Sequence, residues 1–215
     1  MVIGLLTISA IPTVTGVSLG VSEQKKANSR ASDAKRLEKF YLDVFCDATS
    51  EKAKELQGRR VVLRDNKVFL DSPTPTARSI PSHTAQAFYV TYPPDDDKRE
   101  RGLGLVSTIA VDPPMLNWIY VDKDTLEVKY GNRTQSREHL VGPWDWTEDE
   151  TGVTVADLEG FMAVEEEEGV WAVYFDRFGD GLQKVRDEGK EVMEISLERN
   201  LVKPPGEEGR GGGGR

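Results

Sequence analysis

Short apolar strands, separated by turn sequences, follow one another closely from Lys39 to Glu198. The first begins with Phe40, Leu42 and Val44 on one side of an alternating pattern, and about nine such stretches occur with almost no amphipathic helix between them. Alternation of this kind is typical of half-buried strands. The sequence therefore predicts a mainly β protein, an antiparallel sandwich or barrel of about nine short strands, with an N-terminal apolar segment and a short helix.

Three stretches have the form strand, turn, strand. RRVVLRD and KVFLD meet at Asp65 and Asn66, LNWIYVDKDTLEVKYG turns at 122–125, and GFMAVEEEEGVWAVYF turns at 165–169. Each is typical of a β-hairpin. KEVMEISLE, residues 190–198, fits either a closing strand or a helix, because Glu, Lys and Met favour helices. NWIYVDKDTLEVKYG and VWAVYFDRFGDGLQ are alike enough to suggest a weak repeat.

Composition divides the chain into four parts. Residues 1–22 are apolar, 23–37 form a polar basic helix or tether, 38–199 form the antiparallel β domain, and 200–215 form a Pro/Gly-rich tail. The tail has almost nothing to bury, so we expect it to be disordered.

The first 22 residues carry no charged side chain. They could be part of a soluble fold, a membrane segment or a cleaved signal. Pro12 and several glycines interrupt the run, which disfavours a simple spanning helix, and no basic side chain precedes it, which disfavours a secretory signal. If the segment spans a membrane, the basic residues that follow it would place the rest of the chain in the cytosol. We expect a cytoplasmic protein, with membrane association through residues 1–22 as the alternative and secretion as the third.

Charge and cysteine content restrict the partners. The net charge of −9 disfavours binding to the phosphate backbone of nucleic acids. Cys46 is the single cysteine, so the chain forms no internal disulfide, which favours a reducing compartment. One cysteine and two histidines disfavour a zinc site, and no phosphate-binding or dinucleotide motif occurs, so we expect neither a metal nor a cofactor.

The candidate catalytic residues are His139 and Asp145. His139 could act as a general base, as could His83, with Asp112 or Asp145 orienting the imidazole. The alternative, which the sequence favours, is that both histidines are surface loop residues.

Two tryptophans are the candidate ligand-binding residues. Trp144 and Trp146 flank Asp145 in GPWDW, where they could stack on a sugar or an apolar ring, although packing of the loop onto the sheet is the favoured alternative. Asn132 begins an Asn-Arg-Thr glycosylation pattern, which matters only if the chain is secreted.

Acidic residues gather after the central hairpin. The run 165–168 could dock a basic partner, and Asp176, Asp180 and Asp187 surround a glycine turn that could bind calcium. Solvated turns are the favoured interpretation of both.

Four phrases carry a resemblance to a known group: IGLLTISAIPTVTGVSLGVS, LGLVSTIAVDPPMLNWIYVDKDTLEVKYGNR, HLVGPWDW and GFMAVEEEEGVWAVYFD. With them, most of residues 2–178 resembles a family of filamentous-fungal proteins of unknown function. The resemblance implies a fungal source and a strand-rich body, but no activity and no functional residues.

Three functions remain open at this point. The first is a non-enzymatic binding or interaction module that takes a protein or a small-molecule ligand. The second is a small β-barrel isomerase, cyclase or hydrolase of fungal metabolism acting on an apolar small molecule. The third is a membrane-anchored cytosolic domain.

Overall fold

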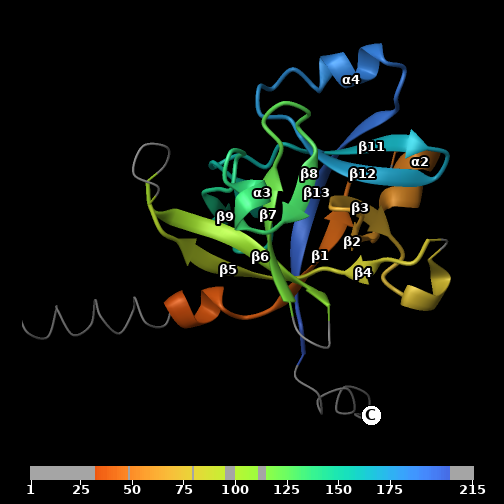
Figure 1. The fold of residues 1–215 in the computed structure, drawn as a ribbon. Coiled ribbons are helices and arrows are strands. Elements are labelled where there is room, and N and C mark those ends of the chain that lie inside the picture. Colours follow the sequence, from red (N-terminus) through yellow and green to blue (C-terminus); the bar gives the residue numbers. More distant parts are fainter. Residues whose placement is uncertain (1–31, 48, 79, 95–99, 111–114, 204–215) are drawn as a thin grey trace, which may run out of the picture. The chain divides into compact units, whose positions relative to one another are not determined.

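The structure, a computed structural model, describes residues 32–47, 49–78, 80–94, 100–110 and 115–203. It divides into a unit that ends at Leu37, of which residues 32–36 are described as a helix, and a unit that begins at Glu38. The apolar segment 1–22 and the tail 204–215 lie outside the described residues. The mainly β prediction is confirmed, because the second unit is an antiparallel sheet of many strands with a few short helices (Figure 1).

Six strands form a closed ring. They are β1 (Phe40–Phe45), β5 (Gln86–Tyr92), β6 (Gly102–Ala110), β9 (Trp144–Trp146), β10 (Val153–Val155) and β13 (Val192–Leu201). β5 pairs with β1 and β6, β9 lies against β6 and pairs with β10, and β13 pairs with β1. A bridge between Gly152 and Glu198 joins β10 to β13, so the ring closes as a barrel.

Three hairpins accompany the barrel. They are β2 (Arg60–Arg64) with β3 (Lys67–Asp71), β7 (Met115–Val121) with β8 (Val128–Gly131), and β11 (Phe161–Glu167) with β12 (Val170–Phe175). The hairpins also pair with one another through Lys67 and Lys129, through Leu70 and Trp171, and through a bridge from Glu127 to Tyr174. All three predicted hairpins are therefore present, and they meet in a triangle.

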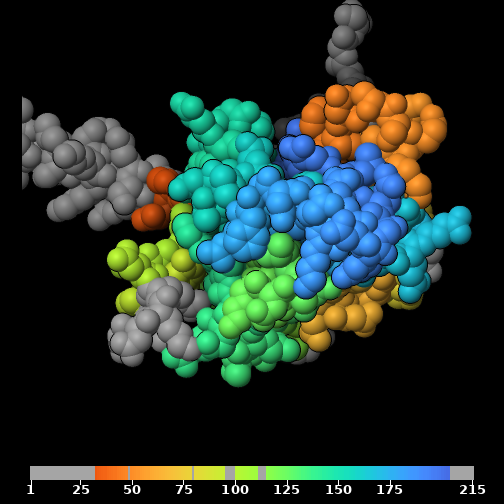
Figure 2. Space-filling view, turned by 90° about the horizontal axis from the view of Figure 1, so that it is seen from above, coloured from red at the N-terminus to blue at the C-terminus, as the bar shows by residue number. Residues whose placement is uncertain are grey.

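The remaining elements are short. β4 (His83–Thr84) pairs with β2, and the helices are α2 (Glu51–Leu56), η1 (Pro75–Ala77), α3 (Arg133–Ser136) and α4 (Gln183–Asp187). In Figure 2 the segment around α4, coloured blue, covers much of the face that this view shows. Beneath it Leu182 and Val192 pack with Met162 and Val164 in a second apolar cluster.

The main core fills the space between barrel and hairpins. Its largest fully buried side chains include Phe40, Trp144, Phe161, Trp171 and Phe175. β1 shows why these strands form, because Phe40, Leu42 and Val44 are buried while the residues between them are not. Burying an apolar side chain of this size contributes about 2 kcal/mol, so the alternating pattern fixes which face of β1 turns inward.

One arginine of the barrel, Arg199, packs against aromatic side chains of the core. The guanidinium carbon of Arg199, on β13, lies 4.5 Å from the ring centre of Trp146 and 4.8 Å from that of Phe40. Its Nη1 donates to the carbonyl oxygen of Glu150 at 2.7 Å. Arg199 thus packs as an aromatic-stacked cation within the barrel.

One local expectation is confirmed and two are revised. Residues 192–201 form the closing strand β13, one of the two alternatives for this segment, because pairing with β1 and β11 outweighs helix propensity. The acidic run belongs mostly to β11, which continues to Glu167. Glu165 forms an ion pair with Lys52, and Glu166 forms one with Lys67, so these two carboxylates are not simply solvated. The suggested repeat aligns β7 with β12, although one is the first strand of its hairpin and the other is the second.

Candidate ligand-binding site

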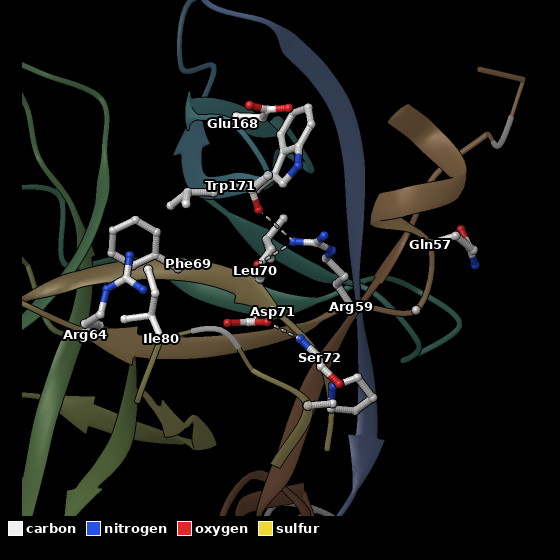
Figure 3. A pocket seen from close by; sticks show the side chains of 15 residues that line it. Gln57, Arg59, Arg64, Phe69, Leu70, Asp71, Ser72, Ile80, Glu168 and Trp171 are labelled. Atoms are coloured by element: carbon white, nitrogen blue, oxygen red, sulfur yellow. Dashed lines mark hydrogen bonds between the residues drawn. The ribbon is translucent and has the colours of Figure 1, made fainter. Parts of the chain in front are cut away.

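A pocket of about 500 Å³ lies beside the β2–β3 hairpin (Figure 3). Its walls come from the α2–β2 link, the hairpin, the loop after β3 and the β11–β12 turn. Figure 3 shows Glu168 and Trp171 on one side, and Asp71 and Ser72 on the opposite side. The full lining comprises Gln57, Gly58, Arg59, Arg64, Phe69, Leu70, Asp71, Ser72, Pro73, Ala77, Ile80, Glu168, Gly169, Val170 and Trp171.

Arg59 holds three of these walls together. Its Nη1 donates to the carbonyl oxygens of Leu70 and Gly169, both at 3.3 Å, and its Nη2 donates to Glu55 Oε1 at 2.5 Å. Trp171 Nε1 donates to the same Glu55 oxygen at 3.2 Å. The charge of Arg59 is therefore compensated by Glu55, and its donors are used to fix the pocket rather than to face a ligand.

The hairpin carries a row of three pocket side chains on the face that turns away from the main core. Residues two apart on β3 point to the same side, so Phe69 and Asp71 lie on one face while Leu70 faces the core. The guanidinium carbon of Arg64, from β2, lies 4.1 Å from the centre of the Phe69 ring. Stacking on the ring holds the Arg64 guanidinium in place while leaving its donors at the edge of the plane.

Two charged groups in this row have unused hydrogen-bonding capacity. Within the described residues no acceptor is hydrogen-bonded to the Arg64 guanidinium, and its ion pair with Asp65 is long, at 3.6 Å. The Asp71 carboxylate accepts one hydrogen bond, from the backbone N–H of Ser72 at 2.7 Å. A carboxylate can accept about four, so Asp71 keeps most of its capacity.

Arg78 fixes the loop that forms the remaining wall. It donates to the carbonyl oxygens of Ser72 and Ser82 at 2.8 and 2.9 Å, and to Thr84 Oγ1 at 2.7 Å. Burial is the main cause that lowers the pKa of Arg78, although the group stays a cation. The wall next to Ile80 is thus held by side chain–backbone bonds.

The predicted catalytic residues belong to different networks. The imidazole of His139 stacks on Tyr120 at 5.1 Å, and its Nδ1 accepts from the Lys123 backbone N–H at 3.3 Å. Asp145 lies in β9, where its carbonyl oxygen accepts from the Tyr89 hydroxyl at 3.1 Å. Neither residue lines the pocket, and their catalytic role stays a prediction.

The other candidate base, His83, is on β4. Its Nε2 lies 3.5 Å from Thr108 Oγ1, and burial lowers its pKa. The neutral imidazole is therefore favoured at neutral pH. Asp112, its suggested partner, lies outside the described residues.

The two tryptophans flank Asp145 on a strand rather than in a loop. Trp144 is 1 % exposed and stacks on Phe161 at 6.1 Å in the core. Trp146 is partly buried and meets Tyr89 edge to face at 5.5 Å. Both therefore take part in packing, and their proposed ligand-binding role stays a prediction.

Asn132 serves a structural purpose at the start of α3. Its side chain accepts from the backbone N–H of Gln135, whose side chain accepts in return from the backbone N–H of Asn132. This is a capping box, in which two free donors at the helix start are satisfied. Asn132 is exposed, and its glycosylation stays a prediction that depends on secretion.

The acidic loop after β12 satisfies its carboxylates internally. The Asp176 carboxylate accepts from the backbone N–H groups of Gly179, Asp180 and Gly181. Asp187 accepts from Gln183 Nε2 at 2.7 Å. Throughout the part of the chain that the structure describes, no group of three His, Cys, Asp or Glu residues is placed to hold a metal ion.

Sequence reasoning missed the pocket because its residues come from four separate segments. The one local signal is in the first hairpin, where Arg64 and Asp71 share a face with Phe69, which is 8 % exposed and is covered by the Arg64 guanidinium. An arginine on the neighbouring strand and an aspartate two residues after the aromatic residue were the local signal of this face.

The barrel and its triangle of hairpins agree with a family comparison. A family model described as a fungal beta-trefoil domain matches residues 16–203. The chain belongs to the fungal β-trefoil domain family. The match extends over most of the chain and agrees with the fungal resemblance noted from the sequence.

No curated protein and no solved structure matches this fungal β-trefoil chain. The β-trefoil is a fold often used for binding or interaction. Among the described residues, no helix is both long enough and apolar enough to cross a membrane.

Proposed function

We propose that this fungal β-trefoil protein is a non-enzymatic binding module whose ligand occupies the pocket between Asp71 and Trp171. The observation that carries the proposal is a pocket whose walls are held by hydrogen bonds and whose lining includes charged side chains with unused hydrogen-bonding capacity. Arg59 ties the walls together, while Arg64 and Asp71 keep hydrogen-bonding capacity on the pocket side. Pre-formed pockets with a few convergent polar groups are typical of ligand sites.

The candidate catalytic residues lie outside the pocket, which supports a binding role for the pocket itself. His139 Nδ1 lies 3.7 Å from Asp122 Oδ1, and the Asp145 carbonyl oxygen accepts from the Tyr89 hydroxyl. Neither His139 nor Asp145 lines the pocket.

The test is a search for ligands with the full-length protein by NMR. Isotope-labelled protein is titrated with a library of small polar metabolites, and the indole N–H of Trp171 reports on the pocket. We expect shifts at Trp171 and at the Ser72 amide, and their loss in Arg64→Gln. Arg177→Gln, at an exposed position outside the pocket, is the matched control.

Two outcomes would contradict the proposal. One is a library in which every ligand leaves the pocket signals unmoved. The other is chemical turnover of a ligand that His139→Ala or Asp145→Ala abolishes, which would establish an enzyme.

We also propose that the protein acts in the cytoplasm. The support is that Cys46, the single cysteine, is buried as a free thiol and burial raises its pKa, as expected of an inert structural thiol. Fractionation of the native host with a carbonate wash, followed by an intact mass, tests this. Protein in the washed membrane fraction, or lacking its first residues, would contradict it.

A further inference from the structure

The pocket has charges of both signs at defined places. Arg64 lies stacked on Phe69, and Asp71 follows Phe69 by two residues on the same strand. Phe69 and Asp71 are roughly 7 Å apart along the strand. Because the Arg64 guanidinium lies on the Phe69 ring, this spacing sets the scale of the gap between the cation and the carboxylate. Glu168 adds a second carboxylate at the rim, where it is exposed.

The balance of these charges selects among ligands. Arg59 contributes little attraction, because its guanidinium is already bonded to Glu55. A ligand with only an anionic group would pair with Arg64 but would also face the carboxylates of Asp71 and Glu168. A ligand with only a cationic group would pair with Asp71 but would face Arg64. Both mismatches leave a charge without a partner, which is costly in a partly enclosed site.

We propose that the ligand is a small zwitterion, with a carboxylate bound by Arg64 and an ammonium group bound by Asp71. This inference rests on the proposed binding function of the same pocket. The chain between the two groups lies over the apolar surface offered by Ile80 and Val170. Arginine is suited to the carboxylate end, because its planar fork can donate two parallel hydrogen bonds.

The probe is 6-aminohexanoate, whose extended chain separates its charges by a similar span. Hexanoate lacks the ammonium group, and hexylamine lacks the carboxylate. We expect 6-aminohexanoate to bind at least about tenfold more tightly than either, as a charge-assisted hydrogen bond at each end would give. The readout is the titration of the Trp171 indole signal in the full-length protein.

Two variants test which residue binds the carboxylate end of the probe and which binds the ammonium end. Arg64→Gln is expected to weaken 6-aminohexanoate and hexanoate about tenfold and to strengthen hexylamine, because the unfavourable cationic neighbour is removed. Asp71→Asn is expected to weaken 6-aminohexanoate and hexylamine about tenfold and to strengthen hexanoate. Arg177→Gln is the control for a lost surface charge. Thermal unfolding of each variant shows that it is folded, and Arg64→Lys, which keeps the charge, is expected to restore part of the carboxylate binding.

The outcomes separate this inference from the proposed function. Equal binding of the three probes, no shift with 6-aminohexanoate up to its solubility limit, or no effect of Arg64→Gln would overturn the zwitterion assignment. If neutral ligands then shift the Trp171 signal, the binding function stands and the ligand class is wrong. If every ligand leaves the pocket unmoved, the binding function fails as well.

Discussion

At the scale of single residues, Arg199 shows how a charged side chain can pack within an aromatic core. Its guanidinium lies among the rings of Phe40, Trp146 and Tyr89, at 4.8, 4.5 and 5.9 Å. Its Nε is buried without a hydrogen-bond partner among the described residues. The favourable contribution of Arg199 therefore comes mainly from stacking and from the bond to Glu150.

We expect Arg199→Ala to lower the free energy of unfolding by about 2 kcal/mol, because the stacking is lost and a gap is left among three rings. Arg177→Ala, which removes an exposed arginine, is the control and should change stability by less than about 0.5 kcal/mol. Urea unfolding followed by tryptophan fluorescence measures both. Equal stability of the two variants would show that the stacked guanidinium contributes nothing.

A second residue-scale prediction concerns the turn of the first hairpin. Asp65 and Asn66 have φ values of 50° and 61°, the left-handed pair of a type I′ turn. Asn tolerates this region better than Ala does. We expect Asn66→Ala to destabilise the protein by about 1 kcal/mol and Asn66→Gly to be neutral or stabilising. The thermal unfolding midpoints of Asn66→Ala and Asn66→Gly test this. A glycine variant less stable than the wild type would argue against a type I′ turn.

At the scale of elements, the junction of the three hairpins is held by a charge network. Lys67 on β3 bonds to Glu127, Glu166 and Tyr174, and Lys129 on β8 bonds to Glu127 and to Asp122. Burial raises the pKa of Tyr174, and Glu166 and Glu127 act in the same direction, so its hydroxyl remains a donor. Each hairpin therefore contributes to one network, which a change of charge state would loosen.

This network predicts an acid limit to stability. Burial acts to raise the pKa of Glu127 from 4.5, but hydrogen bonds from Lys129 and Lys67 outweigh it and lower the pKa to about 2. Bonds from Lys129 likewise outweigh burial at Asp122 and lower its pKa to about 2. A lowered folded-state pKa adds stability that is complete above the unfolded-state value and is lost as the pH falls through the folded-state value.

We therefore expect the free energy of unfolding to fall between about pH 4.5 and pH 2, by about 2–3 kcal/mol for Glu127 alone. Glu127→Gln should be less stable at pH 7 and should show a flatter pH dependence. Glu194→Gln, on the exposed side of β13, is the control and should follow the wild-type curve. Denaturant unfolding across this range gives the answer, and parallel curves for wild type and Glu127→Gln would contradict it.

The elements also show what the sequence could and could not predict. The hairpins were predictable, because each has two apolar runs separated by a short turn sequence. The burial of their strands does not alternate, since Ile119, Tyr120 and Val121 are all buried. β9 and β10 have three residues each, too few for a period of two to be recognised, so the sequence favours a packed loop at GPWDW where the structure has a strand. The pocket was not predictable, because Arg59 and Trp171 come together only when α2 and the β11–β12 turn are in place.

At the scale of the whole unit, the closed ring predicts cooperative unfolding. β13 pairs with β1 from the start of the unit and with β11 from its later part, so no strand group can separate alone. Trp144 lies in the barrel and Trp171 in the hairpin triangle, and both are buried. We expect Trp144→Phe and Trp171→Phe each to keep one shared unfolding midpoint by fluorescence and circular dichroism. Separate midpoints would show that barrel and hairpins unfold independently.

The pairing of β1 with β13 has one more consequence. Phe40 lies opposite Leu201, and the Val202 backbone N–H donates to the Lys39 carbonyl oxygen at 2.9 Å. The polypeptide thus enters and leaves this unit at a single point. Because its two ends are adjacent, the segment 39–202 could be inserted into a surface loop of another protein without separating the ends of that loop, and the inserted segment would keep its pocket.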